Sequence, residues 1–333
     1  GASGHLELMS THDSTFRAMG SEVRLIVEGP ACDGRDPAAA AAETIAFIAE
    51  FERRLSRFRP TSELSRLNAD PRATVPASPL MLDALDAARE VAELTGGLVD
   101  PTLVDEIEAA GYRHSREGAV AARLQDALAL APGRKPAGPS PTRRWELIEV
   151  DHEAGVVHRP PGVRIDSGGF GKGFAADLAV EGLSGFNRCV VGCGGDLRVG
   201  GASADPFEVL VEHPLTGERD QKIVVGSGGV ATSGLNARVW KREDGGFAHH
   251  LIDPSTGRPA WTGLVGVTAL APTAVEAEAR SKAALLAGPG GGAEILRRHG
   301  GLIVHEDGEI EPIGPIRLQP NRRVVIPMNA VAA

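Results

Sequence analysis

The sequence predicts an α+β fold of mixed, mostly antiparallel sheets with flanking helices. Segments with the pattern of strands outnumber those with the pattern of helices, and many follow one another in runs joined by glycine-rich turns. The regular alternation of strand and helix that a doubly wound fold requires is absent. The chain has 333 residues, of which 42% are hydrophobic. It is therefore long enough for a substantial core in one large domain or in two lobes.

The elements of the first half follow from periodicity and capping residues. Residues 16–29 (FRAMGSEVRLIVEG) alternate between apolar and polar side chains, which predicts a strand. Apolar residues recur at helical spacing over 37–58 and predict a long helix. Ser62 is suited to cap a short helix. The segment 78–97 begins with a serine cap and ends with glycines, which predicts a further helix.

A loop separates these elements from the second half. The proline-rich segment 131–144 predicts this loop, and it is a candidate boundary between two lobes. Segments 145–151 and 155–160 predict a pair of hairpin strands. The residues that follow the glycine-rich stretch DSGGFGKG predict a helix through Leu183.

Strands predominate in the remainder of the chain. Segments 188–201, 206–214 and 221–234 predict strands joined by tight glycine turns. The segment 273–288 predicts a helix that Gly288 ends, and 295–308 predicts a short helix followed by a strand.

The composition argues against several classes of protein. The net charge is −9, whereas nucleic-acid binders usually place positive charge against phosphates, so we expect no nucleic-acid partner. No apolar run is long enough to span a bilayer, so we expect no transmembrane segment. The 3 cysteines are too few for a disulfide scaffold, and their spacing fits no zinc site.

The two ends of the chain differ from its middle. The first residues, GASGHLELMS, have no apolar signal-peptide core and resemble a vector scar. We therefore expect a tag or linker over 1–14, the functional domain over 15–315 and a C-terminal tail over 316–333. The localisation is open, either in the cytoplasm or outside it as an exported protein whose leader was trimmed.

The stretch DSGGFGKGFAAD (166–177) is a candidate anion site. Its glycines let backbone N–H groups approach an anion closely, and Lys172 and the start of the following helix add positive charge. The spacing matches neither a P-loop nor a dinucleotide fingerprint. An ordinary strand-to-helix turn with an exposed lysine is the alternative.

Three later motifs carry further polar groups. GCGGD (192–196) places a carboxylate at a tight bend, although a hairpin turn alone would explain it. ATSG (231–234) supplies two hydroxyl groups. In HHLIDPSTGRP (249–259), His250 and Asp253 stand three residues apart and are able to perform acid–base work or bind phosphate. A structural loop is the alternative, because Asp-Pro and Thr-Gly are common in turns.

In this order, DSGGFGKGFAAD, GCGGD, ATSG and HHLIDPSTGRP resemble the motifs of the ApbE family, the FAD:protein FMN transferases. The similarity extends to FRAMGSEV, LSRFRPTSELSRLN and TGGLVDPT before these motifs, and to VTALAPTAVEAEARSKAALLAG after them. It covers almost the whole chain, from Phe16 to about Gly308. Each motif is weak by itself, but the ordered set is specific. The resemblance implies an ApbE-like fold with two lobes around a flavin cleft.

The resemblance also implies a reaction. Members of the family bind FAD with its diphosphate beside Mg²⁺, cleave the diphosphate and transfer FMN to a Thr or Ser of a partner protein, while AMP leaves. The implied ligand is FAD, and the implied partner is an acceptor flavoprotein. Such a phosphoryl transfer requires neutralisation of the diphosphate charge, an acceptor hydroxyl that loses its proton, and in-line alignment.

Residue by residue, the resemblance implies a site. Met19 should pack near the flavin, and Phe58 should flank a ring of FAD. Asp166 should hydrogen-bond the nucleotide, Lys172 should approach it, and His250 is the candidate for assisting proton transfer. The remaining implied residues are Leu98, Val99 and Asp100 in the pocket wall, Ile252 and Asp253 near the diphosphate or the acceptor hydroxyl, with Asp253 as a second catalytic candidate, and Gly169 and Glu278 at the metal.

The late helix departs from the family pattern Ala-Asp-x-x-x-Thr, whose Asp and Thr reach the magnesium. Here the run is AEARSK (277–282), so that Glu278 replaces the Asp and Lys282 replaces the Thr. An ammonium group donates hydrogen bonds and cannot ligate a metal, which makes Mg²⁺ doubtful. One alternative is an exposed helical ion pair with Glu278 on a solvated face. The other is that Lys282 takes the place of the cation beside the FAD diphosphate.

Three functions follow from these residues. The first is a transferase that moves FMN from FAD to a partner protein. The second is an FAD-binding protein without transfer activity, acting as a flavin carrier or regulator, and the third is an FAD pyrophosphatase. By the resemblance, the first and third require a metal, so the change at Glu278 and Lys282 discriminates between them and the second.

Overall fold

The computed structural model describes residues 10–29, 31–203, 205–219 and 221–316, together with the backbone of 318–319 and 326–327. At its centre is an eight-stranded sheet in the order β1-β2-β6-β7-β10-β15-β16-β17. All neighbouring strands in this sheet are antiparallel. The strands are β1 (Thr11–Ala18), β2 (Ser21–Glu28), β6 (Arg188–Cys193), β7 (Asp196–Gly200), β10 (Gly228–Gly234), β15 (Leu264–Ala271), β16 (Gly301–His305) and β17 (Ile310–Ile313).

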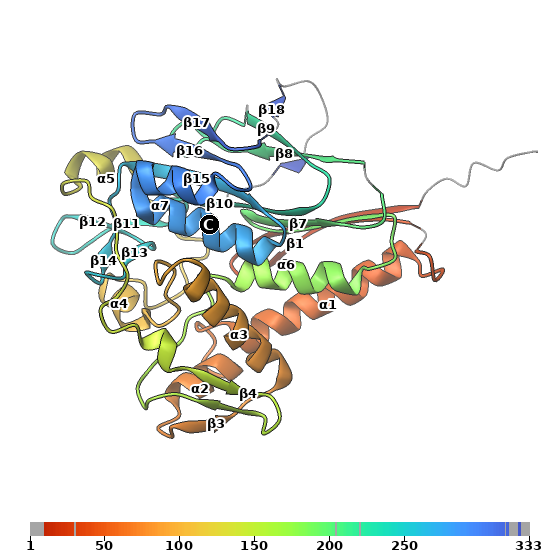
Figure 1. The fold of residues 1–333 in the computed structure, drawn as a ribbon, viewed down its shortest axis with the longest axis horizontal. Helices are drawn as coiled ribbons and strands as arrows, with labels where there is room; N and C mark the ends of the chain where they lie inside the picture. Colours follow the sequence, from red (N-terminus) through yellow and green to blue (C-terminus); the bar gives the residue numbers. More distant parts are fainter. Residues whose placement is uncertain are drawn as a thin grey trace, which may run out of the picture.

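The main part of the molecule has three layers, namely a layer of helices, the central sheet and a second sheet. Helices α1 (Pro37–Leu55), α6 (Gly171–Gly182) and α7 (Ala274–Leu296) pack against the sheet and one another (Figure 1). A second sheet, in the order β18-β9-β8-β19, shares an apolar cluster with strands β6 and β7 of the central sheet. Its strands are β8 (Phe207–Val211), β9 (Gln221–Val225), β18 (Leu318–Gln319) and β19 (Ile326–Pro327), of which β8 and β19 are parallel. The prediction of an α+β fold with mixed, mostly antiparallel sheets is confirmed.

A smaller group of elements lies beside the ends of α1 and α6, in the lower part of Figure 1. Helices α2 (Glu63–Ala69) and α3 (Pro79–Leu94) and a sheet in the order β3-β5-β4 share an apolar cluster with residues of α1, α6 and α7. The sheet consists of β3 (Thr74–Pro76), β4 (Glu149–Asp151) and β5 (Val156–His158). The other elements are α4 (Val104–Ala109), α5 (Leu124–Leu130), the 3₁₀ helices Arg144–Leu147 and Asn236–Arg238, and the hairpins β11 (Val239–Lys241) with β12 (Phe247–His249) and β13 (Ile252–Asp253) with β14 (Arg258–Pro259).

The capping residues act as the sequence predicts. The Ser62 hydroxyl accepts a hydrogen bond from the Ser65 N–H at 2.9 Å, and Ser78 accepts one from the Met81 N–H at 3.3 Å. Gly288, at φ 73°, breaks the helical conformation inside α7. The predicted loop contains neither helix nor strand up to residue 143.

Other predictions need correction. The single strand predicted over 16–29 is a hairpin of β1 and β2, because Met19 (φ 52°) and Gly20 (φ 63°) form a tight turn with two left-handed residues. Residues 11–14, predicted as part of a linker, belong to β1, where they pair with β2. The helices α4 and α5 have only 6 and 7 residues, too few for the periodicity to predict them.

Some expectations concern the ends of the chain. Residues 1–9 of the expected tag or linker lie outside the described residues, as does the expected tail, apart from residue 316 and strands β18 and β19. Within the described part of the chain, none of the helices combines the length and hydrophobicity needed to cross a membrane.

Candidate functional site

A cavity of about 370 Å³ opens where several elements meet. It is lined by the β1–β2 turn, the segment after α1, the start of α6, the β6–β7 turn, and parts of β10 and α7. Segments far apart in the sequence therefore share one wall. Seven of the predicted site residues line this cavity: Met19, Phe58, Asp166, Lys172, His250, Glu278 and Lys282.

Met19 reaches the cavity from a constrained turn. It has a positive φ of 52°, and Arg143 is the other non-glycine residue with this conformation in the described ranges. Such a backbone is uncommon for a residue with a long side chain, and its cost must be met by surrounding contacts. The side chain of Met19 packs at the edge of two apolar clusters. The hairpin thus fixes an apolar side chain at the wall of the cavity.

One part of the wall is aromatic. The rings of Phe58 and Tyr112 lie 5.3 Å apart at a tilt of 53°. The guanidinium of Arg57 lies 4.1 Å from the Phe58 ring centroid and 4.9 Å from that of Tyr112. The guanidinium of Arg238 lies 5.5 Å from the Tyr112 centroid. These are cation–π distances, and they order the rings beside charged groups.

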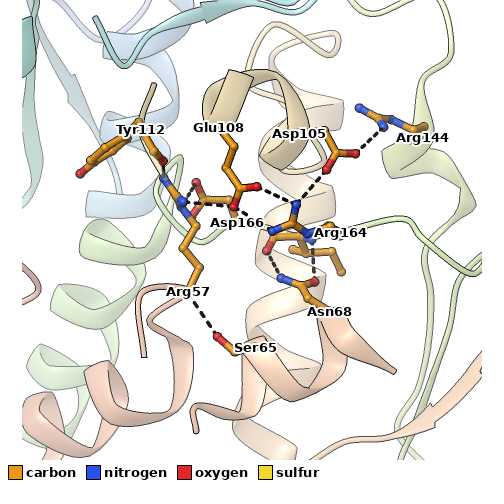
Figure 2. A network of polar contacts seen from close by, with 10 residues as sticks. Arg57, Ser65, Asn68, Asp105, Glu108, Tyr112, Arg144, Arg164 and Asp166 are labelled. Atoms are coloured by element: carbon orange, nitrogen blue, oxygen red, sulfur yellow. Dashed lines mark hydrogen bonds and ion pairs between the residues drawn. The ribbon is translucent and has the colours of Figure 1, made fainter. Parts of the chain in front are cut away.

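A polar network holds Arg57 in this position (Figure 2). Its Nε donates to Oδ2 of Asp166 at 3.1 Å, and its Nη2 donates to the backbone carbonyl of Tyr112 at 2.9 Å. Behind it, Glu108 forms an ion pair with Arg164 at 2.8 Å, and the hydrogen bonds from Arg164 lower the pKa of the Glu108 carboxyl. Only 5% of the Arg57 side chain is exposed, so the network fixes both the stacked guanidinium and Asp166.

Another part of the wall carries cations. Lys172 lies in the first turn of α6, and a β-carbon at Gly194 would lie 3.1 Å from its Nζ. The glycine of the β6–β7 turn therefore leaves room for the ammonium group. Among the described residues, Lys172 has neither an ion-pair nor a hydrogen-bond partner for its side chain. Burial, reinforced by Arg238, lowers the pKa of Lys172, while Asp196 and Glu278 oppose this effect.

Asp196 follows the same turn, at the start of β7, and its side chain is buried. Burial raises the pKa of Asp196 to about 7, and the negative charge of Glu278 acts in the same direction. The cations Lys282, Lys172 and Arg238 oppose this rise. The carboxyl group is therefore close to its midpoint at neutral pH.

The ion pair on α7 forms, but not on a solvated face. Nζ of Lys282 lies 2.6 Å from Oε1 of Glu278, whose side chain is 1% exposed, while that of Lys282 is 13% exposed. Oε2 of Glu278 accepts a hydrogen bond from the Gly173 N–H at 2.7 Å. The alternative of an exposed helical pair is therefore wrong, because α6 covers this face of α7.

His250 follows strand β12 and is half-buried at the cavity wall. Burial lowers the pKa of His250 well below its usual value, and the nearby Arg238, His249 and Lys282 act in the same direction. Its ring is therefore neutral at physiological pH. Nδ1 has no hydrogen-bond partner among the described residues.

Six predicted residues are not among the described residues that line the cavity. Val99 is in the apolar cluster of α1, α2 and α3, with Leu98 packed against it. A β-carbon at Gly169 would lie 3.0 Å from Cγ1 of Val99. Oδ1 of Asp100 accepts hydrogen bonds from the N–H and hydroxyl of Thr102 at 2.8 and 2.6 Å, and burial raises the pKa of Asp100.

Ile252 and Asp253 have structural surroundings. Ile252 belongs to an apolar cluster with Tyr112 and Trp240. Oδ1 of Asp253 accepts hydrogen bonds from the N–H and hydroxyl of Ser255, at 3.0 and 2.7 Å, and from the Gly138 N–H at 3.1 Å. Its Oδ2 accepts one from the Thr256 hydroxyl at 3.0 Å. Asp253 therefore closes a turn and joins it to the proline-rich loop, and its catalytic role stays a prediction.

Four residues of the wall have no role in the prediction from sequence. Arg57 lies within LSRFRPTSELSRLN, whereas Tyr112 and Arg238 lie outside the quoted motifs. Asp196 is the carboxylate of the GCGGD bend. The raised pKa of Asp196 depends on burial and on residues of α7, which the bend itself does not encode.

The residues of this wall do not fit a divalent cation. Both carboxylate oxygens of Glu278 already have partners, and one partner is an ammonium group. A metal ion at Glu278 would face the positive charge of Lys282. Across the described ranges, no group of three or more His, Cys, Asp or Glu side chains is arranged to hold a metal ion. We therefore derive no chemical step from a metal.

Comparison with known proteins finds consistent similarities. The ApbE family model matches residues 19–304. The chain is 29% identical to the FAD:protein FMN transferase of Escherichia coli over 255 residues, covering 74% of this chain and 70% of that protein. It is 29% identical to the Treponema pallidum protein of the same name over 307 residues, covering 84% and 79%. The crystal structure of the ApbE protein from Thermotoga maritima is similar with a TM-score of 0.74 and 27% identity, covering 91% of this chain and 97% of that one.

Proposed function

The chain belongs to the ApbE family, and we propose that it is an FAD:protein FMN transferase. It moves FMN from FAD to a Thr or Ser hydroxyl of a partner protein and releases AMP. One observation carries the proposal, a single cavity that combines aromatic rings with cations. FAD has the complementary parts, because its planar ring systems are joined through a diphosphate.

The two kinds of wall assign the parts of FAD. Phe58 and Tyr112 provide flat and apolar surface for a ring of the dinucleotide, and Met19 adds apolar surface elsewhere in the cavity lining. Asp166 faces the same cavity and keeps acceptor capacity for a nucleotide hydrogen bond, since a carboxylate accepts several. Lys172 contributes a positive charge that no described residue neutralises by direct contact, which suits a phosphate oxygen.

The transfer joins the FMN part of FAD to the acceptor protein and releases AMP. The acceptor hydroxyl oxygen forms a bond to the phosphorus of the FMN moiety, and the bond from that phosphorus to the bridging oxygen breaks. The bridging oxygen leaves with AMP, and the hydroxyl proton passes to a base. We assign this base to His250, which is neutral and has an unpaired Nδ1. The bound diphosphate raises the affinity of His250 for a proton, because its charge opposes that of Arg238 and Lys282.

The predicted residues outside the cavity wall have supporting roles in this proposal. Asp253 closes the turn three residues after His250 and so positions the segment that carries it. Leu98 and Val99 pack beneath the glycine-rich stretch, where Val99 contacts the position of Gly169. Leu98 and Val99 shape the site without touching the reacting atoms, whereas Asp253 stays a second catalytic candidate.

The test combines the protein with FAD and a candidate acceptor domain. Flavin fluorescence that stays on the acceptor in a denaturing gel, with one AMP released per flavin, establishes transfer. FMN and AMP without covalent flavin would indicate the pyrophosphatase instead, and FAD binding without products would indicate a carrier or regulator. His250→Ala should slow transfer at saturating FAD, whereas His114→Gln, an exposed histidine, should not. An unchanged rate in His250→Ala removes the role of His250.

A further inference from the structure

Helix α6 fixes the position of the Glu278 carboxylate. A β-carbon at Gly173 would lie 2.5 Å from the carbonyl oxygen of Ala274, so the glycine allows α6 and α7 to approach closely. At this contact the Gly173 N–H donates to Oε2 of Glu278 at 2.7 Å. The other oxygen, Oε1, accepts from Lys282 at 2.6 Å. The carboxylate therefore holds the Lys282 ammonium at a defined position in the cavity wall.

Lys282 still has donors to offer. An ammonium group has three N–H bonds. Within the described ranges, one of those of Lys282 has an acceptor, which is Oε1 of Glu278. The side chain lines the cavity and is 13% exposed. Two N–H bonds are thus left for a ligand.

Two more cations face the same space. Lys172 and Arg238 line the cavity, and both lie close enough to Asp196 to oppose its raised pKa. In the described ranges neither side chain has an ion-pair or hydrogen-bond partner, although Arg238 stacks on Tyr112. Three cations stand against the carboxyl groups of Glu278 and Asp196. The other carboxylates of the cavity lining each form an ion pair with an arginine, namely Glu52, Glu117, Asp166 and Glu212. This part of the wall therefore has an excess of positive charge, which calls for an anion.

We infer that this cavity binds the diphosphate of FAD without a divalent cation, using the ammonium groups of Lys172 and Lys282 and the guanidinium of Arg238. The inference rests on the proposed function for the identity of the ligand. Charge-assisted hydrogen bonds from these groups neutralise the diphosphate. Glu278 holds Lys282 in place, and Arg238 stacks on Tyr112. At Glu278 the ammonium of Lys282 supplies the positive charge that a metal ion would otherwise supply.

The first measurement is FAD binding by the full chain, followed by flavin fluorescence in excess EDTA and then in excess Mg²⁺. We expect dissociation constants that agree within about twofold. A loss of affinity of about tenfold or more in EDTA, equivalent to a lost charge-assisted contact, would overturn the inference.

The second measurement separates Lys282 from a general effect on folding. Lys282→Met should weaken FAD binding by about tenfold or more in EDTA. It should change riboflavin binding by less than about twofold, because riboflavin has no phosphate. Lys282→Arg keeps the charge and should retain most of the FAD affinity. Lys241→Met, at an exposed lysine on β11, is the matched control and should have no effect. Equal losses for FAD and riboflavin in Lys282→Met, or no loss for either, contradict the inference.

Direct metal binding gives a third readout that does not depend on activity. Electron paramagnetic resonance of Mn²⁺ should show no more binding to the unmodified protein than to Glu278→Gln. One Mn²⁺ per chain that Glu278→Gln removes would overturn the inference.

The failure of the inference differs from that of the proposed function. Transfer of FMN that requires Mg²⁺, with FAD binding lost in EDTA, keeps the function and rejects the inference. If FAD does not bind, the proposed function fails, and inorganic pyrophosphate becomes the probe. Pyrophosphate binding in EDTA that requires Lys282 would then support a metal-free diphosphate site, and its absence would reject one.

Discussion

The Nζ atom of Lys282 lies 2.6 Å from Oε1 of Glu278, one turn earlier on α7, and both side chains are largely buried. The second oxygen of this carboxylate accepts the Gly173 N–H from α6. One hydrogen-bonded chain thus connects two helices at the wall of the cavity. The position of the Glu278–Lys282 pair affects the stability of the fold and the charge that the cavity presents to a ligand.

The two partners of this pair should be energetically coupled. Lys282→Met leaves the Glu278 carboxylate buried with one N–H partner, and we expect a loss of about 3 kcal/mol in the free energy of unfolding. Glu278→Gln combined with Lys282→Met should cost less than the sum of the single changes. Denaturant unfolding of the double-mutant cycle measures this coupling.

The exposed pair Glu294–Arg297, with side chains 69% and 70% exposed, is the control for this cycle. Its coupling should stay below about 1 kcal/mol, because exposed ion pairs contribute little. A coupling between Glu278 and Lys282 no larger than that of the exposed pair contradicts the prediction.

The close approach of α6 and α7 should depend on Gly173. Gly173→Ala places a β-carbon 2.5 Å from the Ala274 carbonyl oxygen, which forces the helices apart. We expect a loss of about 1–3 kcal/mol in unfolding free energy, together with weaker FAD binding. Gly182→Ala on the same helix meets no atom within 4 Å, so it should leave both quantities nearly unchanged. Thermal unfolding and FAD titration of the two variants test this difference.

Affinity for FAD should fall as the pH rises through about 7. Burial raises the pKa of Asp196 to about 7, so the group is neutral below this pH and negative above it. The ionised form repels a diphosphate, and the loss reaches about tenfold between pH 6 and 8. Loss of the proton of Lys172, whose pKa burial lowers, acts in the same direction.

The contribution of Asp196 is isolated by Asp196→Asn, which cannot ionise. This variant should bind FAD with a flatter pH dependence, whereas Asp126→Asn at an exposed position should follow the unmodified protein. The same slope in Asp196→Asn and in the unmodified protein would show that Asp196 does not control binding.

The stability of the fold should decrease as the pH falls from about 6.5 towards 4. His249 is fully buried, and burial lowers the pKa of its ring to about 4. The unfolded chain takes up the proton at about pH 6.5, so the folded state is penalised by about 2 kcal/mol near pH 5. The contribution is fully present above pH 6.5 and is lost as the pH falls through the folded pKa.

Unfolding free energies near pH 7.5 and 5 test this prediction. The difference between the two should be about 2 kcal/mol smaller in His249→Gln than in the unmodified protein. His114→Gln, at an exposed position, is the control. An unaltered difference in His249→Gln rules out this histidine as the source.

Ligand binding at the aromatic part of the wall should depend on the two hydrogen bonds that the Arg57 guanidinium donates. Arg57→Lys keeps the charge but cannot reach both Asp166 and the Tyr112 carbonyl in the same geometry. We expect riboflavin and FAD to bind more weakly by about tenfold, because the stacking order at Phe58 is lost. Arg72→Lys, at a side chain 62% exposed, serves as the control. Isothermal titration with both ligands distinguishes this loss from an effect on the diphosphate alone.

Local sequence signals were sufficient to predict where many helices begin and end. Ser62 and Ser78 cap helices, and Gly288 interrupts one, because each acts on backbone groups within a few residues. The β1–β2 hairpin was missed for a related reason. Its turn uses Met19, a residue type that rarely adopts positive φ, so the pattern continued as one strand.

The pattern of strands and helices along the sequence, by itself, determined the α+β class. The order of motifs indicated the family and selected Met19, Lys172 and His250, which share one cavity. Tertiary structure decided which charges face one another. The Glu278–Lys282 pair is buried rather than solvated because α6 covers that face of α7. The environment of Asp196 likewise depends on packing between distant segments. Burial and long-range proximity set the strength of electrostatic interactions, and no local pattern of residues specifies either.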